Sequence, residues 1–378
     1  MKTVREYEKI FADDCPHFDE LFKFAAASEF LDLGWRHVQA KNYVGVIRLP
    51  SGFQLEILPK IDGSVDELRC LVVKMLRTLK NFSGKKFLDA ELDTSRLPLY
   101  EIFIRNYLDT VSQLVKRGLK SSYVGREENL RVVKGKLLIG RHVRTNFAHR
   151  EKFFVAFDEY GLNRPENRLI KSTLGKLLRM TRDRENFRLT TRLLADFDSV
   201  DASTNFAKDF AAVSIDRQNR GYEVVMQWTK IFLSGKSFTS FAGANKVQAL
   251  LFPMEKLFES FVTHHVRKNF SDSFTVTAQA CEKFLFDVSR SYTLKPDILL
   301  TGDETVIMDA KWKFKIPEAD MYQMFAYSKR YGATKIFLLC PPTVDEICYR
   351  AEDFNVTIFP VDLFDITASM TNLRELVK

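Results

Sequence analysis

The order of apolar segments in residues 245–378 restricts the possible folds of this chain more than any other feature of its sequence. Helical spacing predicts one helix at about 247–269 and another at about 320–331. Short runs rich in β-branched and aromatic residues predict strands near 274–280, 297–301, 305–309, 335–339 and 356–360. Helices and strands in this order are typical of an α/β domain, in which helices cover a central sheet.

Residues 1–244 show a mixed pattern instead. Two apolar segments flank the turn Ser51-Gly52 and predict a β-hairpin over about 42–58. Helical spacing predicts helices at about 65–79, 99–119 and 164–180. Between 123 and 157 we expect short strands with glycine turns, among them one at 136–140.

A segment rich in small and turn-forming residues, 234–245, separates these two patterns. Such composition is typical of a linker, so we expect a domain boundary at residue 244. The sequence therefore predicts an α+β protein, with a mixed N-terminal region at 1–244 and an α/β domain at 245–378.

The positive charge of the chain is concentrated in one segment. The 378 residues include 57 Lys and Arg against 49 Asp and Glu, a formal net charge of +8. Residues 114–152 alone hold 11 basic and 3 acidic side chains, whereas residues 245–378 carry a net charge of −2. This basic arm favours a polyanion or an acidic protein partner, although a merely solvated face fits the same charges. Its candidate contact residues are Lys134, Lys136, Arg141 and Arg144.

Composition argues against membrane, secreted and disulfide-based classes. No apolar run approaches the ~18 residues that cross a bilayer, and the first residues lack the apolar core of a signal peptide. The five cysteines form no CxxC pair, which argues against a zinc site or a disulfide scaffold. We therefore expect a cytoplasmic protein with reduced thiols and no membrane partner.

The strongest chemical signal is a pair of acidic residues followed by a lysine. Asp297 begins one predicted strand, and Asp309 lies near the end of the next. Antiparallel pairing of these strands would bring the two carboxylates together, and Lys311 would point to the same face as Asp309. An ordinary hairpin with solvated charges is the alternative interpretation.

Such a cluster suits the hydrolysis of phosphodiester bonds. Adjacent carboxylates repel each other unless a hard cation lies between them, so we expect Asp297 and Asp309 to bind Mg²⁺, or Mn²⁺ in its place. The cation would polarise a phosphoryl oxygen and lower the pKa of bound water. Lys311 would orient the water or stabilise the developing charge.

Neighbouring helices supply further candidates. Gln323 and Tyr327 have i, i+4 spacing and share a face of the second predicted helix. Glu259 lies beside the apolar stripe of the first helix; such a glutamate is usually a boundary residue, but near a metal it can add a ligand. A complete phosphate-binding loop is missing, because Lys230 replaces the first glycine of the partial match that ends in Gly235-Lys236-Ser237. We therefore expect this chain alone to bind no nucleotide.

The order of these residues resembles that of the PD-(D/E)xK nucleases, one branch of which adds a QxxxY motif on the following helix. Asp297, Asp309-Ala310-Lys311, and Gln323 with Tyr327 match all three parts in order. Further segments resemble the McrC family, the nuclease subunits of McrBC modification-dependent restriction systems: AKNYVG (40–45), EILPKI (56–61), ENRLIK (166–171), MEKLFE (254–259) and YQMFAY (322–327). The resemblance spans most of the chain and implies a PD-(D/E)xK restriction-endonuclease-like domain at 245–378, with Glu259 as an accessory metal ligand.

The resemblance to the McrC family also implies an activity and a partner. Such a protein is a Mg²⁺-dependent endonuclease that cuts double-stranded, typically methylated DNA. Its N-terminal region engages a separate McrB-like AAA+ GTPase hexamer and stimulates it, so the basic arm would contact that partner instead of DNA. A double-strand break generally needs two nuclease lobes, which makes a second copy a further candidate partner. Two alternatives stay open: a stand-alone RecB-like repair nuclease, and a non-catalytic adaptor of an AAA+ protein.

Overall fold

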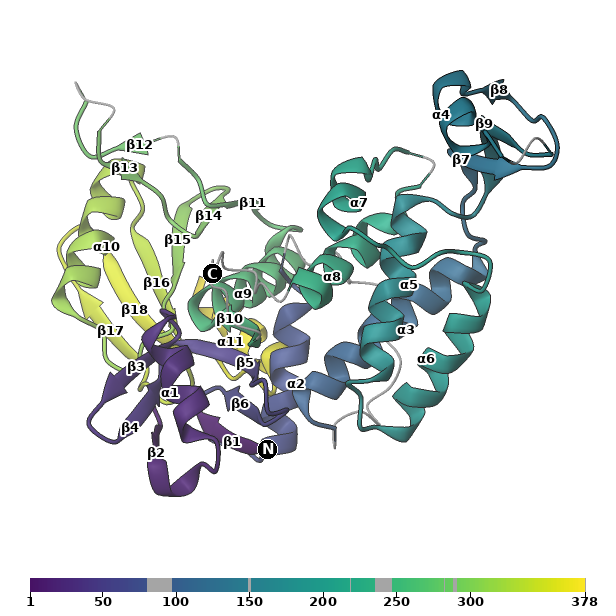
Figure 1. Ribbon diagram of the computed structural model, residues 1–378. Coiled ribbons are helices and arrows are strands. Elements are labelled where there is room, and N and C mark those ends of the chain that lie inside the picture. The colour runs from purple at the N-terminus through teal and green to yellow at the C-terminus, as the bar shows by residue number, and fades with distance from the viewer. Residues whose placement is uncertain are drawn as a thin grey trace. The chain divides into compact units, whose positions relative to one another are not determined.

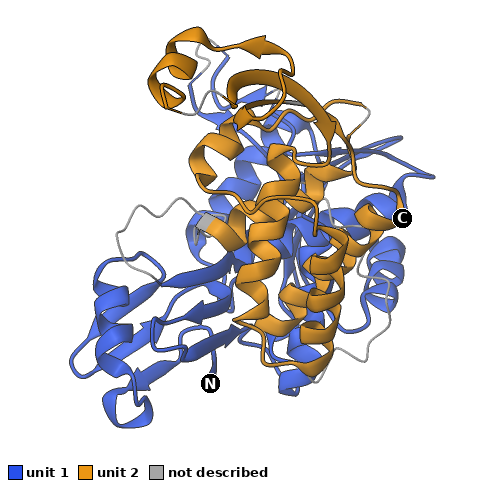
Figure 2. Cartoon of the chain, turned by 45° about the vertical axis from the view of Figure 1, so that its right-hand side comes forward, with its two compact units in different colours: residues 1–99, 236–378 blue, residues 100–235 orange. Residues whose placement is uncertain are grey.

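The chain folds into two compact units (Figure 2). The computed structural model describes residues 1–79, 97–148, 151–217, 219–234, 247–281, 283–287 and 291–377. Unit 1 combines residues 1–99 with residues 236–378, and unit 2 consists of residues 100–235. The predicted boundary at 244, nearly all of the predicted linker, and the partial phosphate-loop match at 235–237 lie outside the described residues.

The two units differ from the predicted regions 1–244 and 245–378. Residues 1–99 belong with the C-terminal part of the chain, because β10 (Gln248–Pro253) pairs with the whole of β5 (Tyr43–Arg48). The helix predicted at 247–269 is therefore wrong at its start, and α9 (Met254–Phe270) begins only after Pro253. Residues 249–252 are buried on both faces, so their unbroken apolar run did not distinguish a strand from a helix.

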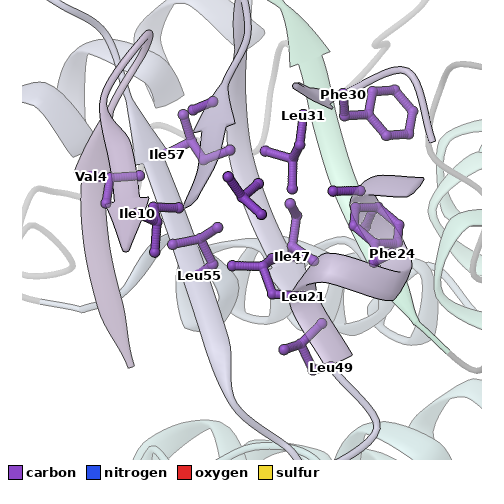
Figure 3. Packing of buried hydrophobic residues seen from close by; sticks show 14 of the residues in the cluster. Val4, Ile10, Leu21, Phe24, Phe30, Leu31, Ile47, Leu49, Leu55 and Ile57 are labelled. Atoms are coloured by element: carbon purple, nitrogen blue, oxygen red, sulfur yellow. The ribbon is translucent and has the colours of Figure 1, made fainter. Parts of the chain in front are cut away.

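Unit 1 begins with a four-stranded sheet in the order β1–β6–β5–β10 (Figure 1). β1 (Lys2–Arg5) pairs in parallel with β6 (Gln54–Leu58), and the antiparallel pairing of β5 with β6 confirms the predicted hairpin. A second, three-stranded sheet has the order β2 (Lys9–Phe11), β4 (His37–Ala40), β3 (Leu31–Gly34). Ile10 of β2, Leu21 of α1 (Phe18–Ala26) and Ile57 of β6 are buried in one core (Figure 3).

Gly45 permits the close pairing of β5 with β10. Its φ is +136°, and a Cβ at this position would overlap the carbonyl oxygen of Leu250. Glycine alone combines this backbone conformation with the absence of a side chain. The junction between the N-terminal and C-terminal parts of unit 1 therefore depends on this residue.

Helix α2 (Val65–Leu76) follows β6 and starts where the sequence predicts. The Ser64 hydroxyl accepts a hydrogen bond from the Glu67 backbone N–H, and the Glu67 carboxylate accepts one from the Ser64 N–H. This reciprocal capping box satisfies two donors that a helix start otherwise leaves without partners.

A six-stranded mixed sheet forms the C-terminal part of unit 1, in the order β11–β14–β15–β16–β18–β17. β14 (Ile298–Thr301) and β15 (Thr305–Ala310) form the predicted antiparallel hairpin. Helix α10 (Glu318–Tyr331) connects β15 to the parallel strand β16, as parallel neighbours require. The remaining elements are β11 (Thr275–Ala278), β12 (Lys283–Phe284), β13 (Thr293–Leu294), β16 (Lys335–Cys340), β17 (Ile347–Arg350), β18 (Asn355–Pro360) and α11 (Ile366–Val377).

Side chains alternate along β15 and so reach two different helices. Ile307 packs in one core with Tyr327 of α10, whereas Trp312, just past the strand, packs against α9. Because residues two apart share a face, Asp309 and Lys311 project to the same side as Ile307, toward α10. The pleat of this one strand therefore decides which residues form the candidate site.

Unit 2 contains a group of helices and a small sheet. The helices are α3 (Leu99–Lys116), α5 (Pro165–Leu178), α6 (Arg184–Asp196), α7 (Phe206–Ala212) and α8 (Tyr222–Ser234). The sheet has the order β7 (Ser122–Leu130), β9 (Phe153–Gly161), β8 (Lys136–Leu137) and carries α4 (Ile139–Thr145). The strand predicted at 136–140 is thus only two residues long, because the chain enters α4 at Ile139.

These helices and mixed sheets confirm the predicted α+β class. Within the described residues, no helix is both long enough and apolar enough to cross a membrane.

Candidate active site

The β14–β15 hairpin places the two predicted carboxylates opposite each other. Ile298 pairs with Met308, so the next position outward sets Asp297 against Asp309. Directly opposite residues of an antiparallel pair project to the same face. The Ala310 backbone N–H donates to Asp297 Oδ2 at 2.9 Å, which fixes the direction of that carboxyl group.

Lys311 connects this pair to helix α10. Its Nζ lies 2.7 Å from Asp309 Oδ2 and donates to Gln323 Oε1 at 3.1 Å. Gln323 Nε2 in turn donates to the Tyr327 hydroxyl at 2.9 Å. The structure therefore brings Asp297, Asp309, Lys311, Gln323 and Tyr327 into one polar cluster in unit 1.

Both carboxyl groups resist ionisation. Burial and the repulsion of Asp309 and Glu259 raise the pKa of Asp297 to about 7. Burial also raises the pKa of Asp309, and the Lys311 ammonium opposes this rise only in part. Each carboxylate therefore favours a positive charge beside it.

The lysine stays charged. Burial by itself would lower the pKa of Lys311, but the attraction of Asp309 and other nearby carboxylates outweighs it and leaves the pKa raised. Burial and the same carboxylates raise the pKa of the Tyr327 hydroxyl, so this hydroxyl stays protonated. The cluster therefore holds one permanent cation and one neutral hydroxyl beside two carboxyl groups.

Glu259 lies near Asp297, but its carboxylate is hydrogen-bonded to Gln279. It adds to the negative potential at Asp297, and its Oε1 accepts a hydrogen bond from Gln279 Nε2. The Gln279 backbone N–H donates to the Asp297 carbonyl oxygen at 2.8 Å, so Gln279 bridges the two acidic residues. Gln279 belongs to no sequence motif and was not among the predicted site residues, because it reaches the site through the pairing of β11 with β14.

A second ion pair beside the site was also missed. Lys313 Nζ lies 2.7 Å from Asp320 Oδ2 and 3.0 Å from its Oδ1. Asp320 is buried in the first turn of α10, and its charge raises the pKa values of both Asp309 and Lys311. The alternation of Lys311 and Lys313 was the one sequence signal for this pair.

The donor set fits a hard divalent cation. Ionised Asp297, Asp309 and Glu259 with one Lys311 ammonium leave two negative charges, which such a cation balances. Among the described residues, no group of three or more His, Cys, Asp or Glu side chains is placed to hold a metal ion together. Mg²⁺ does not require one, since it usually keeps several waters and is held by one or two carboxylates together with substrate phosphates.

Most of the basic arm lies in β7, β8 and α4 of unit 2 and in the turns between them. Lys134, Lys136, Arg141 and Arg144 are all exposed, and Lys134 Nζ lies 4.1 Å from the centre of the Phe157 ring. Arg141 forms an ion pair with a glutamate on β7. Apolar side chains of the same segment are 59–87% exposed, namely Val132, Val133, Ile139, Val143 and Phe147. The charge was visible in the sequence, but this apolar surface was not, since short segments show no clear periodicity.

The fold and the site define an α+β protein with a carboxylate–lysine cluster at the end of a sheet hairpin. A family model for McrBC 5-methylcytosine restriction system components matches residues 38–341. Because this match covers most of the chain, the protein belongs to that family. The resemblance to McrBC systems that the sequence indicated is thereby confirmed.

Two solved structures have a similar fold. One is a chain of the refined half-complex from a tetradecameric assembly of Thermococcus gammatolerans McrB AAA+ hexamers with bound McrC; it has 20% sequence identity and a TM-score of 0.72, and 100% of both chains is covered. The other comes from the cryo-EM structure of the Thermococcus gammatolerans McrBC complex, with 21% identity, a TM-score of 0.51 and coverage of 71% of this chain and 88% of that one. A search of curated proteins finds no match.

Proposed function

We propose that this protein is the McrC-type nuclease subunit of an McrBC-type restriction complex and hydrolyses phosphodiester bonds in double-stranded, typically methylated DNA. The observation that carries the proposal is Asp297 opposite Asp309, with Lys311 2.7 Å from Asp309 Oδ2. Two carboxylates and a lysine at one point are the groups that metal-assisted phosphodiester hydrolysis uses. Membership of the McrBC family supports a role in restriction.

Each residue of the cluster has a distinct task in this proposal. Asp297 and Asp309 hold Mg²⁺ or Mn²⁺, which when bound polarises a phosphoryl oxygen and acidifies water. Lys311 keeps its positive charge and stabilises negative charge on the phosphoryl oxygens. Gln323 accepts from Lys311 and donates to Tyr327, so it fixes the direction of the ammonium group. Glu259 serves as an accessory ligand.

We also propose that the basic arm binds and stimulates an McrB-like AAA+ GTPase hexamer. A chain similar over its full length comes from an assembly of McrB AAA+ hexamers with bound McrC. The arm combines exposed cations with exposed apolar side chains, as protein interfaces do, whereas DNA contacts go mainly to charged phosphates. A second copy of the nuclease unit would cut the opposite DNA strand.

Plasmid cleavage tests the proposal. The purified chain, its AAA+ partner, GTP and Mg²⁺ are incubated with methylated and unmodified plasmid. We expect cleavage of methylated DNA, and a loss of about 100-fold or more for Asp309→Asn and Lys311→Ala, because each removes a group that stabilises charge in the transition state. Asp303→Asn, on the exposed turn of the same hairpin, is the matched control and should cleave normally.

Three other results would favour different functions. Normal cleavage by Asp309→Asn and Lys311→Ala would show that the site assignment is wrong. Cleavage that needs neither partner nor GTP would favour a stand-alone RecB-like nuclease. Stimulation of the GTPase without any cleavage would favour a non-catalytic adaptor.

A further inference from the structure

Glu6 is a buried carboxyl group that contacts the segment carrying the site lysine. It follows β1 directly and is 1% exposed. Its Oε2 accepts hydrogen bonds from Trp312 Nε1 at 3.2 Å and from the Lys60 backbone N–H at 3.1 Å. Trp312 follows Lys311 in the chain and lies 306 positions after Glu6. The N-terminal part of unit 1 therefore contacts the segment that carries the site lysine through this carboxyl group.

Trp312 is the anchor of the segment after β15. It is 3% exposed, and its ring centroid lies 5.2 Å from that of Phe258 and 5.8 Å from that of Phe314. The Lys311 backbone N–H donates to the Leu339 carbonyl oxygen at 2.9 Å, and the Lys313 N–H donates to the Lys311 carbonyl oxygen at 2.9 Å, so the chain makes a tight turn at Trp312 as it leaves β15. Trp312 directly follows Lys311 in this turn, so a fixed Trp312 restricts the direction of the Lys311 side chain.

Burial favours the neutral, protonated form of Glu6. Burial, with a contribution from nearby Glu255, raises the pKa of Glu6 to about 8. Oε2 already accepts two N–H groups, whereas Oε1 is buried with no hydrogen-bond partner among the described residues, so the proton of the neutral acid belongs on Oε1. Glutamine has the same shape, with an amide nitrogen in place of Oε1 and an accepting oxygen in place of Oε2.

We propose that Glu6 is a positioning residue for the cleavage reaction, which fixes residues 311–314 through Trp312 and thereby directs Lys311 toward Asp309 and Gln323. The proposal rests on the proposed nuclease function. The Lys313–Asp320 ion pair holds the same segment to α10, so the segment has one anchor in Glu6 and another in α10. Removal of either anchor frees the lysine without changing any group that contacts DNA or metal.

Hydrogen exchange tests the contact without relying on activity. The full chain is compared as wild type, Glu6→Ala and Glu6→Gln, and exchange of the backbone amides of residues 311–314 is followed by mass spectrometry. We expect faster exchange in Glu6→Ala, because the freed segment opens more often, and wild-type exchange in Glu6→Gln. Glu101→Ala is the matched control: it removes another buried carboxylate whose hydrogen bonds lie in unit 2, and it should leave this segment unchanged.

Cleavage kinetics with the partner and GTP test the consequence. We expect kcat to fall about 10- to 100-fold in Glu6→Ala, as for other groups that orient reactive side chains, with KM for DNA unchanged. We expect wild-type kcat in Glu6→Gln, because glutamine keeps the accepting oxygen. If the charge of the carboxylate were required, Glu6→Gln would be as slow as Glu6→Ala. Thermal unfolding of all variants separates this effect from a general loss of folded protein.

Each opposite result overturns the proposal. Unchanged exchange at 311–314 in folded Glu6→Ala would show that Glu6 does not hold the segment. Faster exchange with wild-type kcat would show that the held position does not matter for cleavage. Equal damage in Glu6→Gln and Glu6→Ala would show that charge, and not the accepting oxygen, is what matters. Absence of cleavage by the wild type would instead reject the proposed function, while the exchange experiment still decides whether Glu6 holds the segment.

Discussion

Ionisation of Asp297 lowers the free energy of unfolding of the metal-free protein. The pKa of this carboxyl group is about 7 against an ordinary 3.8, because burial and Asp309 disfavour the anion. The folded state then binds more protons than the unfolded state, so stability falls as the pH rises from about 4 to about 7. We expect Asp297→Asn to raise the stability of the metal-free protein at pH 8 by about 1–4 kcal/mol. Urea unfolding in EDTA at pH 5 and pH 8 measures this difference.

Added Mg²⁺ should reverse this loss of stability. Wild-type protein should gain more stability from Mg²⁺ at pH 8 than at pH 5, since the cation competes with protons for the carboxylates. Asp297→Asn should gain little, and Asp303→Asn on the hairpin turn should gain as much as the wild type. Equal stabilisation of wild type and Asp297→Asn would contradict a cation held by the carboxylate pair.

The residues that the sequence located in the site are those whose contacts are local. Asp297, Asp309 and Lys311 belong to one hairpin, and its two-residue alternation fixes their common face. Glu6 and Gln279 reach the same region through pairing with distant strands, which periodicity along one segment does not show. Their roles could be found only once the strand order was known.

At the level of single elements, the pairing of β5 with β10 depends on Gly45. Alanine there must adopt a φ of +136° and overlaps the Leu250 carbonyl oxygen, so β10 is pushed away from its partner. We expect Gly45→Ala to destabilise unit 1 by more than about 1 kcal/mol, measured by thermal unfolding. Gly175→Ala in α5, where a Cβ meets nothing within 4 Å, is the matched control and should be neutral or stabilising. Equal stability of Gly45→Ala and wild type would disprove the close pairing.

The basic arm is an element with a separate prediction. Replacing Lys134, Lys136 and Arg141 with Glu reverses the charge of its exposed surface, so we expect stimulation of the partner GTPase to be lost while the fold is retained. A GTPase assay with increasing amounts of the variant measures this effect. The control reverses three exposed arginines on one face of α6, Arg184, Arg188 and Arg192, and should stimulate normally. Intact stimulation combined with weaker DNA binding would make the arm a DNA contact.

Element boundaries were predicted well where a physical stop signal is present. The Ser64 capping box begins α2, and Pro165 stands at the first turn of α5. In contrast, residues 248–253 carry no alternation because both faces of the strand are buried, so their apolar run did not separate the strand from the helix that follows. The helix predicted at 247–269 therefore includes this strand, whereas the predicted boundary at 244 rested on the composition of residues 234–245.

At the level of the whole molecule, the candidate active site belongs to a unit built from both ends of the chain. β10 needs β5 as its partner, Trp312 needs Glu6, and the Ser260 hydroxyl donates to the Thr78 carbonyl oxygen at 2.7 Å. Residues 245–378 by themselves would leave the apolar face of β10 and a buried tryptophan N–H without partners. We therefore expect that a chain divided at residue 244 does not yield a self-sufficient C-terminal domain.

Fragments test this conclusion directly. Residues 245–378 expressed alone are expected to be aggregated or unfolded, because unpaired strand edges and exposed apolar surface favour association. Co-expression with residues 1–99 as a separate chain should restore a soluble complex, whereas residues 100–235 should fold alone, since they bury their own core around Tyr107 and Leu174. Circular dichroism and thermal unfolding distinguish the three samples. Cooperative unfolding of residues 245–378 without residues 1–99 would show that the C-terminal part is an independent domain after all.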